Sequence, residues 1–377
     1  MRSIKRNRRK NYPLARVSFR RPDLILGVLI VLAVVFGIFS IYNASSVSAF
    51  TDFGDKYYYL KEQLKWFGFG FFSLIFFSLF DYRKLYFFSP FLLLLAIVLL
   101  ALVFIPGLGI KAYGASRWLD FRLFSFQPSE LAKFSLVIYL SAWFSEKEKG
   151  RLWAFLLLSG LLLVLIFLQP DMGTAVVLAS TAILLYFLSG APLWHLATLL
   201  PIAGACGYIL IRISPYRFQR LVSFLNPNTD PLGVSYHLRQ ILIALGSGGL
   251  WGLGLGQSRQ KYAYLPESTT DSIFAIIGEE VGFVGATVLI LFFLFCFWRG
   301  FKIAKSAPDR FGQLLAAGIT SWLAIQVFVN LSAMVALIPL TGVPLPFISY
   351  GGSSLVVALS GVGILLNISR QRMGTRK

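Results

Sequence analysis

The sequence predicts an all-α polytopic integral membrane protein with about ten transmembrane helices, and three observations support this prediction. Hydrophobic residues make up 57% of the 377 residues, and charged residues make up only 14%. The mean hydropathy is +0.73, and no soluble domain of this length needs so much apolar surface. Apolar segments that can span a membrane, some as short or tilted helices, cover residues 23–43, 62–80, 87–105, 129–144, 153–169, 174–190, 193–212, 271–297, 312–339 and 351–368.

Basic residues are concentrated at both ends of the chain and predict that both termini are cytoplasmic. Residues 1–22 carry nine Lys or Arg and no acidic residue, and the tail 369–377 is also basic. The positive-inside rule and anionic membrane lipid both favour the cytoplasmic side for such ends. An even number of spans agrees, and this topology places 22 of the 35 Lys and Arg inside. The transmembrane domain then covers 23–368, and the net charge of +19 does not indicate a nucleic-acid partner.

Residues 213–270 form the only sizeable loop, and the predicted topology places it outside the membrane. A loop of about 58 residues inside a compact fold is usually functional, re-entrant or disordered. Its many aromatic residues argue against disorder, so we expect part of it to fold back at membrane depth. The glycine run 246–256 fits no nucleotide-binding motif. Those glycines are expected to allow close helix packing or sharp turns.

Asp271 follows this loop, where polar sequence gives way to an apolar segment. A carboxylate at the mouth of a membrane span is costly to keep ionised, so it is a functional candidate. The alternative is helix capping, since Thr269, Thr270 and Asp271 all suit an N-cap position.

Basic side chains in the loop are unusual, because this side of the membrane normally carries few of them. Arg presents a planar fork that suits phosphate oxygens, so the loop indicates an anionic, lipid-borne substrate. Anchoring of the loop to lipid headgroups is the alternative. Arg217 and Arg220 are three residues apart and would share one face of a helix as a clamp. The basic residues of the loop are Arg217, Arg220, Arg239, Arg259 and Lys261.

Further charged residues lie at the outer ends of other spans. Glu130 and Lys133 have the i, i+3 spacing of an ion pair that lets both charges enter the membrane. Contact with the substrate is the alternative for this pair. Asp171 precedes Met-Gly-Thr after a proline, so it suits either a helix cap or a substrate contact. His195 and His237 are too isolated in the sequence to form a metal site.

Seven polar and glycine-containing motifs follow one another along the chain. In order they are Gln127-Pro-Ser-Glu-Leu-Ala-Lys133, Gln169-Pro-Asp-Met-Gly-Thr-Ala175, Arg220-Leu-Val-Ser-Phe-Leu-Asn-Pro, Ala244-Leu-Gly-Ser-Gly-Gly, Gly254-Leu-Gly-Gln-Ser-Arg-Gln-Lys261, Leu265-Pro-Glu-Ser-Thr-Thr-Asp271 and Pro344-Leu-Pro-Phe-Ile-Ser-Tyr-Gly-Gly-Ser-Ser354. Taken together, these motifs resemble the SEDS family of bacterial cell-wall polymerases (shape, elongation, division and sporulation) over nearly the whole chain. The resemblance is closer to the division members than to the elongation members. One departure from the family is Ser272, which stands where Phe commonly follows the Asp.

The resemblance implies a peptidoglycan glycosyltransferase that polymerises lipid II into a growing glycan strand and releases undecaprenyl pyrophosphate. It also implies a class B penicillin-binding protein as crosslinking partner, within the division or elongation machinery of the bacterial cytoplasmic membrane, here expected at the septum. Asp271 would be the general base, and Arg217, Arg220 and Lys261 would stabilise the leaving pyrophosphate. A divalent cation such as Mg or Mn could share that task, although no ligand cluster identifies a site. The remaining expected substrate contacts are Glu130, Lys133, Asp171, Gln240 and Glu267.

Two other functions use the same features. A transporter that flips the same lipid also needs many spans and a charged cavity. A non-catalytic scaffold would only position the crosslinking partner. The outside acid facing a basic loop and the absence of inverted repeats discriminate the polymerase from the transporter, and the scaffold stays an alternative.

Overall fold

The computed structural model describes most of the chain. Part of the basic N-terminal segment, the end of the basic tail and part of the 213–270 loop lie outside the described residues. The described residues are 17–19, 21–112, 115–122, 124–146, 151–226, 235–262 and 264–373.

Helices dominate the described residues, and one lies at each of the ten predicted apolar segments. Two further helices, α8 and α9, fall inside the large loop. The helices are α1 (Leu24–Phe53), α2 (Tyr58–Leu79), α3 (Arg83–Leu102), α4 (Pro128–Ser145), α5 (Leu152–Leu168), α6 (Met172–Leu188), α7 (Leu193–Ile213), α8 (Pro215–Leu225), α9 (Tyr236–Gly248), α10 (Ile273–Ser306), α11 (Arg310–Met334) and α12 (Gly352–Arg370).

Within the described chain, six helices are long and apolar enough to cross a membrane by length and composition: α1, α3, α7, α10, α11 and α12. The apolar helices α5 and α6 are shorter, with 17 residues each. Helix α4 carries Glu130 and Lys133, which lower its hydropathy. The structure thus places helices where hydropathy predicted them, with a range of lengths that tilting can accommodate.

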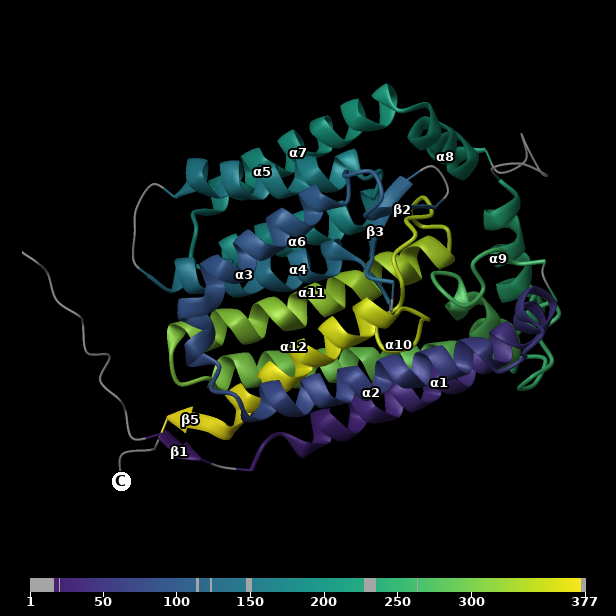
Figure 1. The fold of residues 1–377 in the computed structure, drawn as a ribbon, viewed down its shortest axis with the longest axis horizontal. Helices are drawn as coiled ribbons and strands as arrows, with labels where there is room; N and C mark the ends of the chain where they lie inside the picture. Colours follow the sequence, from purple (N-terminus) through teal and green to yellow (C-terminus); the bar gives the residue numbers. More distant parts are fainter. Residues whose placement is uncertain are drawn as a thin grey trace, which may run out of the picture.

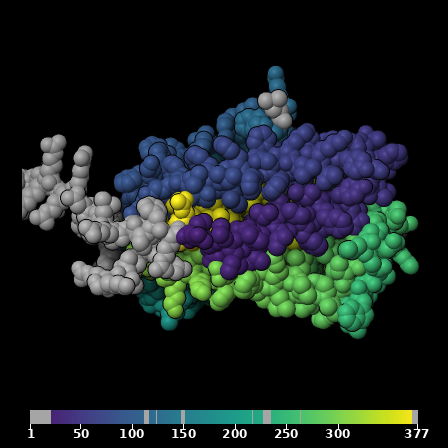
Figure 2. Space-filling view, turned by 90° about the horizontal axis from the view of Figure 1, so that it is seen from below, coloured from purple at the N-terminus to yellow at the C-terminus, as the bar shows by residue number. Residues whose placement is uncertain are grey.

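The core is formed by α4, α11 and α12, which lie inside a layer of the other helices (Figure 1). In the most apolar 18-residue stretch of α12, 89% is buried, whereas in the corresponding stretch of α7 only 6% is buried. Small residues let α12 approach α2 closely, since a Cβ on Gly363 would lie 2.5 Å from the Leu74 carbonyl oxygen. Helix α1 lies along one face of the molecule between α2 and α10 (Figure 2). Leu and Phe side chains on the outer helices point outward, as expected of surfaces that face lipid.

Among the described residues, five short strands depart from the predicted all-α structure. Strand β1 (Val17–Phe19) pairs antiparallel with β5 (Gln371–Met373). A three-stranded antiparallel sheet forms in the loop between α3 and α4, from β2 (Gly109–Ala112), β3 (Ala115–Asp120) and β4 (Ser125–Phe126). These segments are too short and too mixed in polarity to register as spans, and their pairing partners satisfy backbone groups that no helix covers.

Different strands and helices lie at the two ends of the bundle (Figure 1). The paired strands β1 and β5 lie at one end, and α8, α9 and the sheet of β2 and β3 lie at the other. Asp23 helps to fix the first end, because its carboxylate accepts from Arg299 at 2.6 Å and its N–H donates to Ser369 Oγ at 2.9 Å. Both described chain ends therefore lie opposite the large loop, which is the relative arrangement that an even number of spans requires.

Thiol labelling tests the predicted orientation. In a Cys206→Ala background, we expect an impermeant maleimide to label Thr51→Cys and not Lys305→Cys in right-side-out membrane vesicles. Thr51 is exposed near the C-terminal end of α1, and Lys305 is exposed near the C-terminal end of α10. Permeabilised vesicles serve as the control and should label both positions. Labelling of Lys305→Cys alone in sealed vesicles would reverse the orientation.

Candidate active site

Asp271 lies in a tight turn just before α10 and is 9% exposed. The turn forms around Glu267, which has a left-handed φ of 50°. The Glu267 carbonyl accepts from the N–H groups of Thr270 at 3.2 Å and Ser272 at 3.1 Å. The N-cap residue of α10 is Ser272, and no side chain forms the cap hydrogen bond. The capping role considered for Asp271 is therefore wrong, and its carboxylate is left for another task.

The backbone of Asp271 is held by a buried amide from α11. Asn330 is 1% exposed, and its Nδ2 donates to the carbonyls of Asp271 and Val343, both at 2.8 Å. The N–H of Tyr350 donates to the Thr269 carbonyl at 2.8 Å. The turn that carries the acid is thus joined to the α11–α12 loop at two points.

The electrostatic surroundings of Asp271 favour a carboxyl that can exchange a proton near neutral pH. Burial raises the pKa of Asp271 to about 6, with repulsion from Glu267 as the second cause, while Arg220 opposes the shift. The Thr270 hydroxyl lies 2.7 Å from Glu267 Oε2 and 3.2 Å from Asp271 Oδ1, so it links the two acids. A carboxyl with this pKa is mostly ionised at pH 7 and is still basic enough to accept a proton.

Arg217 and Arg220 do not form one clamp, although both lie on α8. Arg220 Nη1 donates to the Leu340 carbonyl in the α11–α12 loop at 3.1 Å, on the side of Asp271. Arg217 Nη2 instead donates to the Phe167 carbonyl near the end of α5 at 2.9 Å. The two arginines therefore contact different elements at the end of the bundle that holds the large loop.

Arg117 is a second guanidinium near Arg217, and sequence reasoning missed it. Its Nε donates to the Gln169 carbonyl at 3.1 Å, and its Nη2 donates to the Pro170 carbonyl. Burial lowers the pKa of Arg217, and the charge of Arg117 lowers it further. Only the basic, mixed-polarity sequence of the 106–128 loop could have drawn attention to Arg117.

Glu130 and Lys133 form a buried ion pair on α4, which confirms that interpretation of their spacing. Their charged atoms are 2.8 Å apart, and both side chains are 2% exposed. Lys133 Nζ also donates to Gln326 Oε1 at 2.9 Å, and Gln326 Nε2 donates to the Pro344 carbonyl at 3.1 Å. The pair is therefore connected to the α11–α12 loop, and its contact with substrate stays a prediction.

Asp171 caps α6, as one of the two interpretations predicted. Its Oδ1 accepts from the Thr174 N–H at 3.1 Å, and its Oδ2 accepts from Gln127 Nε2 at 3.4 Å. Gln240 is half-buried on α9, one turn after His237. Substrate contacts by Asp171 and Gln240 stay predictions.

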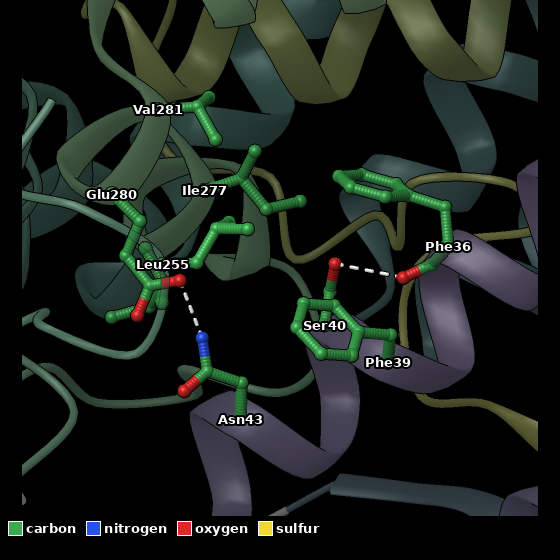
Figure 3. Close-up of a pocket in the computed structure, with 9 residues that line it drawn as sticks. Phe36, Phe39, Ser40, Asn43, Leu255, Ile277, Glu280 and Val281 are labelled. Atoms are coloured by element: carbon green, nitrogen blue, oxygen red, sulfur yellow. Dashed lines mark hydrogen bonds between the residues drawn. The ribbon is translucent and has the colours of Figure 1, made fainter. Parts of the chain in front are cut away.

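Lys261 belongs to a second polar cluster rather than to the surroundings of Asp271. Its Nζ donates to Asn43 Oδ1 at 3.0 Å and to the Gly256 carbonyl at 2.5 Å, and lies 3.9 Å from Glu280 Oε1. Asn43 of α1 also donates to Glu280 of α10, at the polar end of a small cavity between these helices (Figure 3). This grouping could not be predicted from the sequence, because Asn43 lies in the first span, far from Lys261 along the chain.

A kink in α10 explains how the glycine run 246–256 is held against this helix by backbone hydrogen bonds. Gly282 has a φ of 68°, which interrupts the helix and frees backbone groups on both sides. The carbonyls of Glu279 and Glu280 accept from the N–H groups of Leu253 and Gly254, both at 3.0 Å. A Cβ on Gly252 would lie only 2.1 Å from the Glu280 carbonyl oxygen, so close backbone approach requires glycine there. The predicted role of these glycines in close packing and turning is confirmed.

The side chain of Glu279 reinforces this arrangement. It is 1% exposed and accepts from Ser258 Oγ at 2.5 Å and from the Arg259 N–H at 3.1 Å. Two adjacent carboxylates in an apolar segment were the available sequence signal for this cluster. Within the described ranges, no group of three His, Cys, Asp or Glu side chains could hold a metal ion. The involvement of Mg or Mn therefore stays a prediction.

Comparisons with known proteins agree with this architecture. Residues 23–374 match the family described as cell cycle protein, represented by FtsW, RodA and SpoVE. Stage V sporulation protein E of Bacillus subtilis is 43% identical over 357 residues, which cover 93% of this chain and 97% of that protein. The probable peptidoglycan glycosyltransferase FtsW of Geobacter metallireducens is 39% identical over 371 residues, which cover 97% of this chain and 99% of that protein.

Two solved structures have the same fold. The rod shape determining protein RodA of Thermus thermophilus superposes with a TM-score of 0.69 at 28% identity, covering 93% of this chain and 97% of that one. A chain from a peptidoglycan synthase complex that coordinates polymerization and crosslinking gives a TM-score of 0.76 at 28% identity. That match covers 93% of this chain and 98% of the other.

Two ion pairs of the same spacing provide a stability test. We expect Lys133→Met to lower the free energy of unfolding by about 3–5 kcal/mol, because it leaves the Glu130 charge buried and unpaired. Lys65→Met is the matched control, since Lys65 pairs with Glu62 at i, i+3 with side chains that are 65% and 30% exposed. Its cost should be about 0–1 kcal/mol. Thermal unfolding in detergent measures both.

The double change Glu130→Gln with Lys133→Met should recover much of the lost stability, because it removes both charges. Equal costs for Lys133→Met and Lys65→Met would contradict a buried pair at Glu130 and Lys133.

Proposed function

Because the chain belongs to the cell cycle protein family of FtsW, RodA and SpoVE, we propose that this peptidoglycan glycosyltransferase polymerises lipid II with Asp271 as its general base. One observation carries the assignment. A buried carboxyl with a pKa of about 6 lies in a fixed turn at the end of the bundle that holds the large loop. A general base works best when its pKa lies near the working pH.

The chemistry requires a proton acceptor at this point. A hydroxyl of the acceptor sugar attacks the anomeric carbon of the donor, and its proton passes to the Asp271 carboxylate. The new glycosidic C–O bond forms as the bond between the anomeric carbon and the pyrophosphate oxygen breaks. Undecaprenyl pyrophosphate leaves with the electron pair of that bond.

Arginines on α8 suit the charge that develops on the leaving group. Arg220 approaches Asp271 closely enough to oppose the rise of its pKa, and Arg217 lies beside Arg117 near the α5–α6 turn. Fixed guanidinium groups can stabilise pyrophosphate oxygens without reorganisation. The contacts of Lys261 with Asn43, Gly256 and Glu280 instead favour a role in holding the glycine run.

Relatives of this chain support a setting in cell-wall assembly. One solved relative works in a complex that joins polymerization to crosslinking. We therefore extend the proposal to a class B penicillin-binding protein as partner and to a place in the division machinery at the septum. The similarity to a stage V sporulation protein makes a sporulation septum a second setting for the same chemistry.

Asp271→Asn tests the assignment directly. We expect glycan polymerisation from lipid II to fall by about 10²–10⁴-fold, because the amide cannot take the proton. The amount of glycan strand formed per unit time from lipid II, separated on gels, measures the rate for purified protein in vesicles. Asp52→Asn is the matched control, because Asp52 is exposed at the C-terminal end of α1 and should behave as wild type.

The wild-type kcat/KM should also fall as the pH drops below about 6, because protonation of Asp271 removes the base. Near wild-type polymerisation by Asp271→Asn would contradict the role of Asp271 as the general base. Movement of labelled lipid II between leaflets, without polymer, would instead support a transporter.

The arginine assignment has its own test. We expect Arg217→Ala and Arg220→Ala to lower turnover of lipid II, and the corresponding Lys variants to recover only part of it. Lys keeps the charge but lacks the planar fork that binds two phosphate oxygens. Arg212→Lys is the control, since Arg212 is exposed and stacks on Tyr208.

Vesicles of neutral and anionic lipid separate substrate binding from headgroup anchoring. Full activity of the double Arg217→Lys, Arg220→Lys variant in neutral vesicles would contradict recognition of the pyrophosphate by these forks.

A further inference from the structure

His237 on α9 contacts both ends of the turn that carries Asp271. Its Nε2 lies 2.7 Å from the Ser272 hydroxyl oxygen, at the end of the turn. A hydrogen bond to the main chain of Pro266 is formed at the start of the turn. Proline has no N–H group, so this second bond must run from the imidazole to the Pro266 carbonyl. The imidazole therefore bridges the two residues that flank the segment 267–271.

The protonation state of His237 defines the direction of both bonds. Burial, and after it the nearby charge of Arg220, lowers the pKa of His237 to about 4, so the ring is neutral at pH 7. A neutral imidazole has one N–H donor and one acceptor nitrogen. Since Nε2 faces Ser272, the proton on Nδ1 goes to Pro266, and the Ser272 hydroxyl donates to Nε2. One tautomer satisfies both partners.

We propose that His237 and Ser272 form a clamp that positions the Asp271 carboxylate for proton transfer. This inference rests on the proposed role of Asp271 as the base, and it makes His237 a positioning residue. Ser272 is fully buried and directly follows Asp271, so movement of Ser272 moves the acid. Asn330 holds the carbonyl of Asp271 from α11, while His237 holds the flanks of the turn from α9. Two separate helices thereby fix one short segment.

The clamp also explains how the acid stays buried. Within the described residues, the charged groups that affect Asp271 are Glu267, on its own turn, and Arg220, on α8. Repulsion between Glu267 and Asp271 would favour opening of the turn toward water, where both charges are better solvated. A bond at each end of the segment opposes that opening.

A double-mutant cycle tests the clamp. We expect His237→Ala and Ser272→Ala each to lower kcat by about 10- to 100-fold, as small misplacements of reacting groups do. The double variant should be no worse than either single variant, because both changes break the same connection. In each variant the acid limb of the kcat/KM profile should move from about pH 6 toward the ordinary carboxyl value of 3.8, since the opened turn admits water.

His195→Ala is the matched control. Its imidazole also bonds to a hydroxyl, that of Tyr186 at 2.8 Å, but it lies on α7 near the end of α6, away from Asp271. Turnover and the acid limb should both stay at wild-type values. His237→Gln should recover part of the activity, because its amide offers one acceptor and a donor.

Additive losses in the cycle would overturn the clamp, and so would a fall in kcat with an unmoved acid limb, which indicates a purely structural role. Hydrogen exchange separates this failure from failure of the proposed function. If Asp271→Asn remains active, faster amide exchange across 266–272 in His237→Ala and Ser272→Ala would still support the clamp, and unchanged exchange would refute it.

Discussion

The outer end of this molecule depends on two hydrogen bonds that the buried Asn330 amide donates to the carbonyls of Asp271 and Val343. Irregular backbone near the membrane is tolerated only where protein groups satisfy it, because an unpaired carbonyl costs several kcal/mol in apolar surroundings. One turn earlier, Gln326 does the same for Pro344. Helix α11 thus offers a row of amides that turns two loops into a rigid surface beside the acid.

The fold could be predicted largely because its main signal is local. Hydropathy locates each span, the Glu130–Lys133 pair follows from i, i+3 spacing, and the cap at Asp171 follows from the residues beside it. The rest depends on contacts between distant segments. Nothing near Lys261 in the sequence indicates Asn43, which lies in the first helix and accepts from its ammonium group. Strand pairing between β1 and β5 joins the two ends of the chain, and spacing along the sequence carries no information about it.

Of the candidate site, Asp271 was accessible from sequence and its supports were not. A carboxylate at a span boundary is conspicuous by its cost. Asn330 was an available signal too, as a polar residue inside an apolar helix, but its meaning requires knowing that Asp271 and Val343 lie on either side of it. For the arginines of α8, the sequence predicted a shared clamp that the structure does not contain. Helical spacing places Arg217 and Arg220 on one face, yet long side chains diverge to carbonyls on different elements.

The burial of α12 has a consequence for how this chain is made. It is among the most enclosed of the spans, and it is synthesised after the other described helices. Until it arrives, the site that it fills beside α2, α4, α10 and α11 must remain open within the bilayer or be occupied by lipid. Strand β5 follows α12 directly, so its pairing with β1 can form only after α12 has been synthesised. The centre of the bundle therefore closes only once α12 is present, and a chain truncated before α12 would expose to lipid the faces of α2, α4, α10 and α11 that α12 covers.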